Sequence, residues 1–295
     1  MAVLDRIRIR SSGTAGARGA RWNSGAGLLL ALVATVLRSG SFVAARALHD
    51  TVPPVQAAFW RWIVAVAAVA PFAARETWRQ RALIRRHLGF VALAALLGVT
   101  VYNTLVNQAG MSTSAGQMGL IMAASPVAMA VYERLGGRRL GWCRIAGTAV
   151  ACTGVLLLVG NGSLAPHFAP GDLWMFAAML SSASYSALLC HRPAEIGQLA
   201  FLLTTFVLGA LMPAPAFAVG VAVQGGFEPT AGTVGPLLYA GVLSSAVAFF
   251  AWNRAVALIG ASRTGIVYYL QPVCLGGVAL GAGRARGRAA ANVRT

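Results

Sequence analysis

The sequence predicts an all-α polytopic membrane protein made of two inverted five-helix repeats, with about nine transmembrane helices present and the tenth missing or truncated. Three observations predict this class. Hydrophobic residues make up 58% of the 295 positions and charged residues only 11%, with a mean hydropathy of +0.70. A soluble domain of this length would need more charge on its surface. In addition, the basic residues collect in short blocks between apolar runs, and one pattern of residues occurs twice.

Apolar runs of membrane-crossing length follow one another along the chain. A helix needs about 20 apolar residues to cross the hydrocarbon core of a bilayer. Measured against that length, the predicted spans are Ser24–Ala45, Val55–Ala74, Leu88–Gln108, Ala115–Tyr132, Trp142–Val159, Leu173–Cys190, Leu199–Val221, Pro236–Leu258 and Thr264–Gly283.

The placement of the basic residues, which are all arginine, predicts how the spans are oriented in the membrane. Blocks of arginine precede the first span, separate the second from the third, and separate the fourth from the fifth. Short cytoplasmic loops are enriched in basic residues, so these loops and the N-terminus are predicted to be cytoplasmic, in a bacterial inner membrane. Residues 1–22 are then a basic cytoplasmic tail, with an organelle transit peptide as the alternative. A charge of +17 placed in this way does not indicate a nucleic-acid partner.

The repeated pattern relates two stretches that lie 146 positions apart. Asn107, Ala115, Gly119 and Pro126-Val127 recur as Asn253, Ala261, Gly265 and Pro272-Val273. Because five spans are an odd number, the second copy enters the membrane from the opposite face, and the repeat is predicted to be inverted. Two such halves that rock against each other provide alternating access to a site between them. Secondary transport is therefore the leading hypothesis.

The offset divides the chain into a first repeat of five spans, residues 23–160, and a second repeat of four, residues 170–283. A tenth span should begin near Gly287, but residues 284–295 form an Arg-rich tail. We expect a truncated or frameshifted C-terminus, or a ninth segment that inserts poorly; a genuine nine-span protein is the alternative. The corresponding alternative function is a non-transporting remnant or a membrane scaffold that only binds other proteins.

The order and spacing of several short motifs resemble the EamA-type transporters of the drug/metabolite transporter superfamily. The motifs are Ser39-Gly40-Ser41-Phe42-Val43-Ala44-Ala45-Arg46, Pro53-Pro54, Arg61-Trp62, Tyr102-Asn103-Thr104-Leu105, Ser125-Pro126-Val127, Gly171-Asp172-Leu173-Trp174, Trp252-Asn253-Arg254 and Tyr269-Leu270-Gln271-Pro272-Val273. The resemblance extends from Leu30 to about Gly283. It implies ten helices in two inverted five-helix repeats that export or exchange small metabolites, amino acids or drugs.

The chain departs from the pattern of that family in the first span. Where the family usually has Trp before the first Ser-Gly, this chain has Arg38, and Ser41 takes the place of the usual Asn. An arginine in the middle of a bilayer costs about 2.5–3.5 kcal/mol on insertion scales. Arg38 is therefore predicted to face a wet cavity or a partner.

Polar residues inside the apolar spans are the candidates for a substrate site, because such residues normally face the interior of a bundle. The residues predicted to line a central cavity are Arg61, Asn103, Asn107, Trp252 and Gln271. Aromatic walls are expected from Trp60, Trp62, Tyr102, Tyr185, Tyr268 and Tyr269. The alternative role is interhelical hydrogen bonding, worth about 0.6 kcal/mol per pair. Arg61 and Arg254 would suit a ligand that carries a carboxylate.

Pro126 and Pro272 occupy equivalent places in the two halves and are predicted to form a hinge or gate, because each leaves a carbonyl one turn back without its amide donor. The scattered cysteines and the seven carboxylates form no catalytic or metal-binding motif. No enzymatic activity, metal or cofactor is expected. The expected partners are a small-molecule substrate and the lipid bilayer, with a homodimer left open.

Proton coupling generally needs a carboxylate inside the membrane, and Glu133, near the cytoplasmic end of the fourth span, is the candidate. We predict that Glu133→Gln leaves substrate binding intact and abolishes pH-driven uptake into vesicles. Binding measured beside uptake separates the two effects. An unchanged pH dependence of uptake would remove Glu133 from the mechanism.

Overall fold

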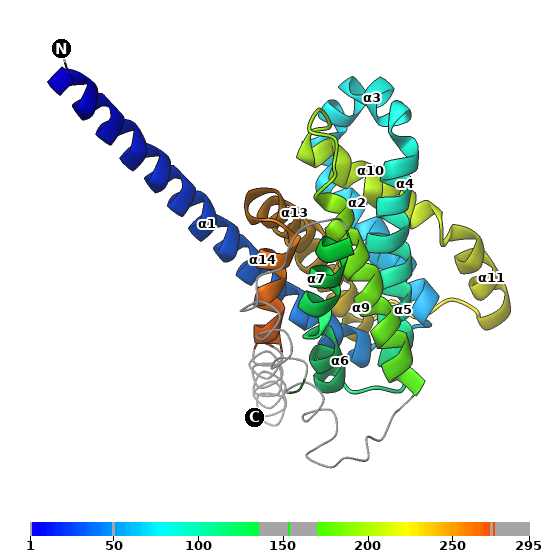
Figure 1. Ribbon diagram of the computed structural model, residues 1–295. Helices are drawn as coiled ribbons and strands as arrows, with labels where there is room; N and C mark the ends of the chain where they lie inside the picture. The colour runs from blue at the N-terminus through cyan, green and yellow to red at the C-terminus, as the bar shows by residue number, and fades with distance from the viewer. Residues whose placement is uncertain (1, 49–50, 136–152, 154–169, 272–273, 275–295) are drawn as a thin grey trace, which may run out of the picture.

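The computed structural model describes residues 2–48, 51–135, 153, 170–271 and 274, and the regular elements in that part of the chain are all helical (Figure 1). Within it, 6 helical segments are long and apolar enough to cross a membrane. They are Ser24–Ala45, Pro54–Arg79, Leu88–Gly110, Ala115–Tyr132, Gln198–Val223 and Ala231–Ile259. The prediction of a helical protein with several segments suited to cross a membrane is therefore confirmed for the described residues. The predicted fifth span and much of the ninth lie outside the described residues.

The predicted sixth span is helix α9 (Pro170–Leu189), which has the required 20 residues but is less apolar than the six segments above. Asp172 and several serines lower its hydropathy. Ser181, Ser182 and Ser186 are buried, as is Asp172. The polar side chains of α9 thus face other helices, as expected for a helix inside a membrane bundle.

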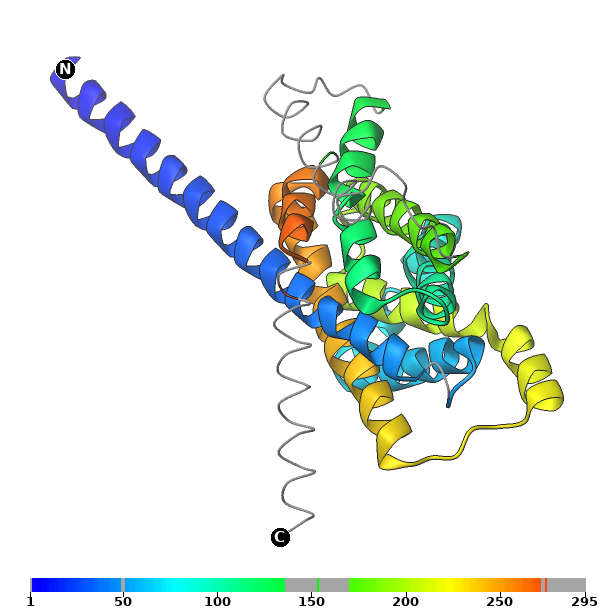
Figure 2. The ribbon, with the colours of Figure 1, turned by 90° about the horizontal axis from the view of Figure 1, so that it is seen from below.

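The chain begins with two long helices. α1 (Ala2–Ala47) extends well beyond the bundle at its N-terminal end (Figures 1 and 2). α2 (Pro54–Arg79) begins with Pro54 in the first helical position, where the missing N–H of proline has no intrahelical partner to lose. The short helix α3 (Arg81–Arg86) follows and carries Arg81, Arg85 and Arg86.

The third and eighth spans are each interrupted by a π-helical segment. The third consists of α4 (Leu88–Ala95), η1 (Leu96–Val101) and α5 (Tyr102–Gly110), and the eighth of α12 (Ala231–Leu238), η2 (Tyr239–Val247) and α13 (Ala248–Ile259). Short π segments inside α-helices are frequent at functional sites. Here η2 carries the buried Ser244 and Ser245, and η1 ends just before the buried Asn103.

The fourth span is broken near its proline. α6 (Ala115–Met122) ends before α7 (Ser125–Leu135) begins, so Pro126 lies in the first turn of a new helix, where proline is tolerated. Glu133 belongs to α7, but its side chain is outside the described part of the structure. The described part of the ninth span forms α14 (Ala261–Gly265) and the 3-10 helix η3 (Ile266–Leu270). Pro272 lies outside the described residues.

The seventh span is also broken. α10 (Gln198–Leu211) ends just before Pro213, and α11 (Ala214–Gln224) turns away from the bundle, to the right in Figure 1. The end of α11 is tied back to α2, because Gln56 Nε2 donates to the Gly225 carbonyl oxygen at 2.8 Å.

Helices α2 and α10 pack side by side and run antiparallel. The C-terminal end of α2 meets the start of α10, where the Gly197 N–H donates to Gln80 Oε1 at 2.9 Å. Farther along, the ring of Trp62 lies 4.8 Å from that of Phe206, and Phe59 near the start of α2 stacks on Phe217 of α11 at 4.0 Å. These contacts follow the two helices along their length, so α2 and α10 form one antiparallel pair.

The close approach of η2 to α2 depends on Gly241. A Cβ at this position would lie 2.9 Å from the Arg61 carbonyl oxygen, whereas a Cβ at Gly235, in the neighbouring α12, would meet no atom within 4 Å. We predict that Gly241→Ala destabilises the protein by about 1–3 kcal/mol through overpacking. Gly235→Ala, the matched control, should be neutral or stabilising by up to about 1 kcal/mol because alanine favours the helix. Melting temperatures of the two purified variants in detergent compare them; equal values would contradict the close approach.

Candidate functional site

Polar contacts converge on one short segment of α1. Its carbonyl oxygen at Leu37 accepts from the Tyr239 hydroxyl at 2.9 Å, and Ser39 Oγ accepts from Gln271 Nε2 at 3.5 Å. The partners therefore come from η2 and from the residue that follows η3. We refer to the residues around this segment as the central polar cluster. Its members are Arg38, Ser39, Ser41, Arg61, Tyr102, Ser244, Ser245, Trp252, Tyr268 and Gln271.

Arg61 reaches from α2 to both α1 and η2. Its Nη1 donates to Ser41 Oγ at 2.7 Å, its Nε to Ser245 Oγ at 2.6 Å, and its Nη2 to Ser244 Oγ at 3.2 Å. The side chain is only 4% exposed. All three acceptors are neutral hydroxyls, so each guanidinium nitrogen has one hydrogen-bond partner but the charge is not balanced.

Arg38 lies among aromatic rings. Its guanidinium carbon is 4.7 Å from the ring centroid of Phe249, 5.1 Å from that of Tyr102 and 5.7 Å from that of Trp252. Nη1 also donates to the Tyr268 hydroxyl at 2.8 Å. A cation within about 6 Å of an aromatic ring centroid is attracted by the negative face of the ring. The predicted partner of Arg38 is thus a group of aromatic side chains.

The central polar cluster carries two positive charges. Arg38 and Arg61 are close enough to repel each other, and neither contacts a carboxylate among the described residues. Asp172 is a buried carboxylate among the described residues, and it accepts hydrogen bonds from neutral groups. The donors are Thr113 Oγ1 at 3.0 Å and Gln117 Nε2 at 3.5 Å. A buried charge without a partner costs on the order of several kcal/mol, so the cluster favours an anion.

Several buried polar atoms of this region have no hydrogen-bond partner among the described residues. They are Arg38 Nε, Asn103 Oδ1, Asn253 Nδ2 and Gln271 Oε1. Leaving such an atom unsatisfied costs about 1–3 kcal/mol. Donors and acceptors therefore remain available for a polar ligand near the two arginines.

The residues predicted to line a cavity are only partly brought together. Arg61, Trp252 and Gln271 belong to the central polar cluster, and Asn103 follows Tyr102 directly in α5. Asn107 lies one turn further along α5 and donates from Nδ2 to the Pro54 carbonyl oxygen at 3.4 Å. Among the predicted aromatic walls, Trp62, Tyr102, Tyr185 and Tyr268 are buried, whereas Trp60 is 40% exposed. Arg254 is exposed, so it does not join Arg61.

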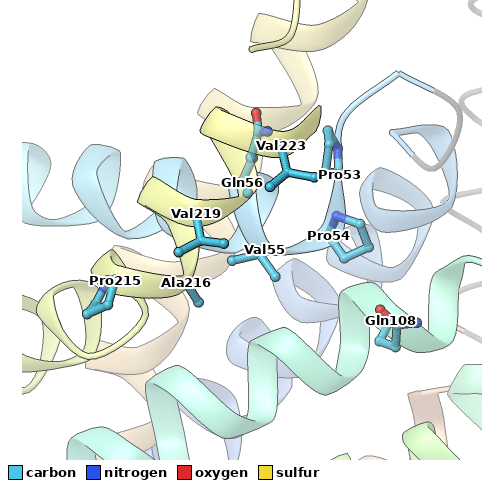
Figure 3. Close-up of a pocket in the computed structure, with 10 residues that line it drawn as sticks. Pro53, Pro54, Val55, Gln56, Gln108, Pro215, Ala216, Val219 and Val223 are labelled. Atoms are coloured by element: carbon cyan, nitrogen blue, oxygen red, sulfur yellow. The ribbon is translucent and has the colours of Figure 1, made fainter. Parts of the chain in front are cut away.

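A separate pocket of about 580 Å³ lies beside Pro54 and Asn107, between the start of α2 and α11 (Figure 3). Ala216, Val219 and Val223 of α11 line one side, and Gln108 of α5 lies on another. Gln56 and Gln108 are its polar lining residues. The pocket carries no charged group, in contrast to the central polar cluster.

Sequence reasoning predicted that Arg38 faces a wet cavity or a partner but did not include it among the residues of the substrate site, and it missed Ser244 and Ser245. The available signal was a pair of adjacent hydroxyls in the middle of an apolar span. Such hydroxyls commonly bond to their own helix backbone, so the sequence alone does not indicate that they face an arginine.

Comparison with known proteins identifies the family. The profile of the EamA-like transporter family matches residues 25–160 and residues 169–280. The chain belongs to this family of membrane transporters. The resemblance inferred from the sequence motifs is confirmed, and the transporter relatives favour a function other than catalysis.

Curated relatives of this EamA-like protein include transporters from bacteria and an archaeon. The "Probable terminal-alkyne amino-acid exporter" of Streptantibioticus cattleyicolor is 30% identical over 196 residues, which are 64% of each chain, just under two thirds of the exporter's length. The "Uncharacterized transporter YdfC" of Bacillus subtilis is 23% identical over 80% of this chain and 76% of its own. An "Uncharacterized transporter" of Archaeoglobus fulgidus is 26% identical over 85% and 86%, respectively.

Arg61 offers a test of whether the cluster serves function or stability. Arg61→Met removes a buried charge, and the three serine hydroxyls it leaves can bond to backbone carbonyls of their own helices. We predict that the unfolding free energy of this variant, followed by its melting temperature in detergent, stays within about 1 kcal/mol of the parent's. Transport by the same variant should fall at least tenfold. Arg254→Ala, on the exposed surface, is the control. A large loss of stability with Arg61→Met would instead indicate a structural role.

Proposed function

We propose that this chain is a secondary transporter that exports or exchanges small metabolites, amino acids or drugs by alternating access between two inverted repeats. The observation that carries the proposal is the antiparallel packing of α2 and α10. These helices begin at Pro54 and Gln198, close to the 146-position offset of the sequence repeat, so they are equivalent members of the two halves. Equivalent helices that run in opposite directions are what an inverted duplication produces.

Helix boundaries support the same offset. α5 begins at Tyr102 and α13 at Ala248, while η1 ends at Val101 and η2 at Val247; each pair is 146 positions apart. The starts of α6 and α14, Ala115 and Ala261, have the same spacing. The same offset thus relates both the repeated residues and the positions at which helices begin and end.

Contacts between the halves come in equivalent pairs in which the two halves trade roles, as a two-fold axis requires. α1 packs against α13 of the second half, and α9 packs against α5 of the first. Likewise α2 contacts η2, and α10 contacts η1. An axis between α2 and α10 would relate these contacts, which supports two halves that rock as similar bodies.

The central polar cluster joins the halves at this axis. Arg61 and Ser41 belong to the first half, and Ser244 and Ser245 to the second. Because Arg38 and Arg61 are buried, a ligand reaches them only when the halves separate on one side of the membrane. The break before Pro126 would serve as a hinge, with Pro272 as its counterpart, and Arg61, Asn103, Asn107, Trp252 and Gln271 would line the opened path.

The proposal includes nine spans in a bacterial inner membrane, with the N-terminus in the cytoplasm. This orientation follows from the arginines of α3, which would lie on the same side as the arginines of the N-terminal tail. Amino acids are the first substrates to test, since one relative is named as an amino-acid exporter.

The proposal predicts substrate exchange by the purified chain in proteoliposomes. Vesicles loaded with unlabelled L-propargylglycine, an amino acid with a terminal alkyne, should accumulate the labelled compound. Phenylalanine, the anion phenylacetate and cationic dyes extend the panel. The folded Arg61→Met variant is the matched control and should exchange at least tenfold more slowly. A folded parent protein that exchanges none of these compounds would favour the scaffold or remnant.

A further inference from the structure

We propose that Arg38 determines the charge selectivity of the transport site. Its guanidinium occupies an aromatic box that would otherwise suit an organic cation, and together with Arg61 it makes the site one for organic anions. This inference rests on the proposed transport function and names the substrate class of the same site.

The box is formed by residues from three separate segments. Tyr102 comes from α5, Phe249 and Trp252 from α13, and Tyr268 from η3. Trp252 and Tyr268 support each other, with ring centroids 4.6 Å apart, and Trp252 Nε1 is anchored by donating to Ser186 Oγ at 3.1 Å. A rigid set of aromatic faces around a cation is the arrangement that recognises quaternary ammonium and guanidinium ligands.

In this protein the cation in the box is part of the chain itself. The guanidinium carbon lies within 6 Å of three ring centroids, and the hydroxyl of Tyr268 accepts one of its N–H groups. A free organic cation would have to displace Arg38 from the box, because both would use the same ring faces. Arg38 therefore acts as a tethered competitor against cationic substrates.

The same residue adds attraction for anions. Arg38 Nε is a buried donor that has no acceptor among the described residues, and Arg61 lies close enough to contribute a second charge. A carboxylate near the two guanidinium groups would accept charge-assisted hydrogen bonds and balance the charge that the described carboxylates leave uncompensated. A cationic ligand at that place would add a third positive charge in a medium of low dielectric constant.

The test compares the binding of small probes of different charge to the purified protein in detergent, measured by thermal shift. Phenylacetate, phenethylamine and methylguanidinium are the anionic, cationic and guanidinium probes. The parent protein should be stabilised by phenylacetate and not by the two cations. Arg38→Ala vacates the box, so methylguanidinium should bind it at least tenfold more tightly than the parent, and phenylacetate at least tenfold more weakly.

Two further variants complete the comparison. Arg38→Lys keeps the charge and should still exclude both cations, whereas Arg254→Ala on the outer surface should bind all three probes as the parent does. If Arg38→Ala does not fold, Arg38→Trp, which introduces the residue that the family resemblance implies here, takes its place and should lose at least tenfold in phenylacetate affinity.

Equal stabilisation of the parent by phenylacetate and phenethylamine would overturn the inference, as would an Arg38→Ala protein without any gain for methylguanidinium. Exchange assays in proteoliposomes separate this failure from failure of the proposed function. A parent that exchanges phenethylamine as fast as phenylacetate is a transporter without the selectivity inferred here. A parent that exchanges no compound contradicts transport itself.

Discussion

The hydrogen bonds of Arg61 to Ser41, Ser244 and Ser245 bring side chains of both halves of this protein around a charge that none of them neutralises. Hydroxyls orient the guanidinium and accept one hydrogen bond from each of its nitrogens, whereas an anion would also offset the free energy of burying the charge. The cation of Arg38 lies nearby and adds to the same imbalance. This imbalance is the physical reason for proposing that a ligand supplies the missing negative charge.

The interruptions of the helices place these groups. The π segment η2 carries Ser244 and Ser245, and the one that ends at Val101 leads into Tyr102 and Asn103. Thr100 Oγ1 donates to the Gly209 carbonyl oxygen at 3.1 Å, so η1 is bonded to α10 much as η2 is packed on α2. Regular helices would turn these side chains by a different angle. The departures from α-helical geometry thus position the central polar cluster.

Apolar runs and the arginine blocks were sufficient to predict an all-helical membrane protein, and the motifs from Ser39 to Gln271 were sufficient to predict its family. The breaks in helices were predictable only in part: Pro126 and Pro213 mark two of them, but nothing in Leu96–Val101 indicates a π segment. The site was harder to predict. Arg61, Trp252 and Gln271 could be chosen because polar residues in spans are costly, whereas the aromatic box of Arg38 depends on how three distant segments rotate toward one another.

Accessibility of the cluster from the two sides of the membrane tests the central claim most directly. A single cysteine at Ser245, in a protein whose own Cys143, Cys152, Cys190 and Cys274 are replaced by serine, is exposed to a membrane-impermeant thiol reagent in right-side-out and inside-out vesicles. Alternating access requires labelling from both sides, with rates that change in opposite directions when a transported anion is added. Labelling from neither side, with full labelling after denaturation, would show a closed structural core and contradict it.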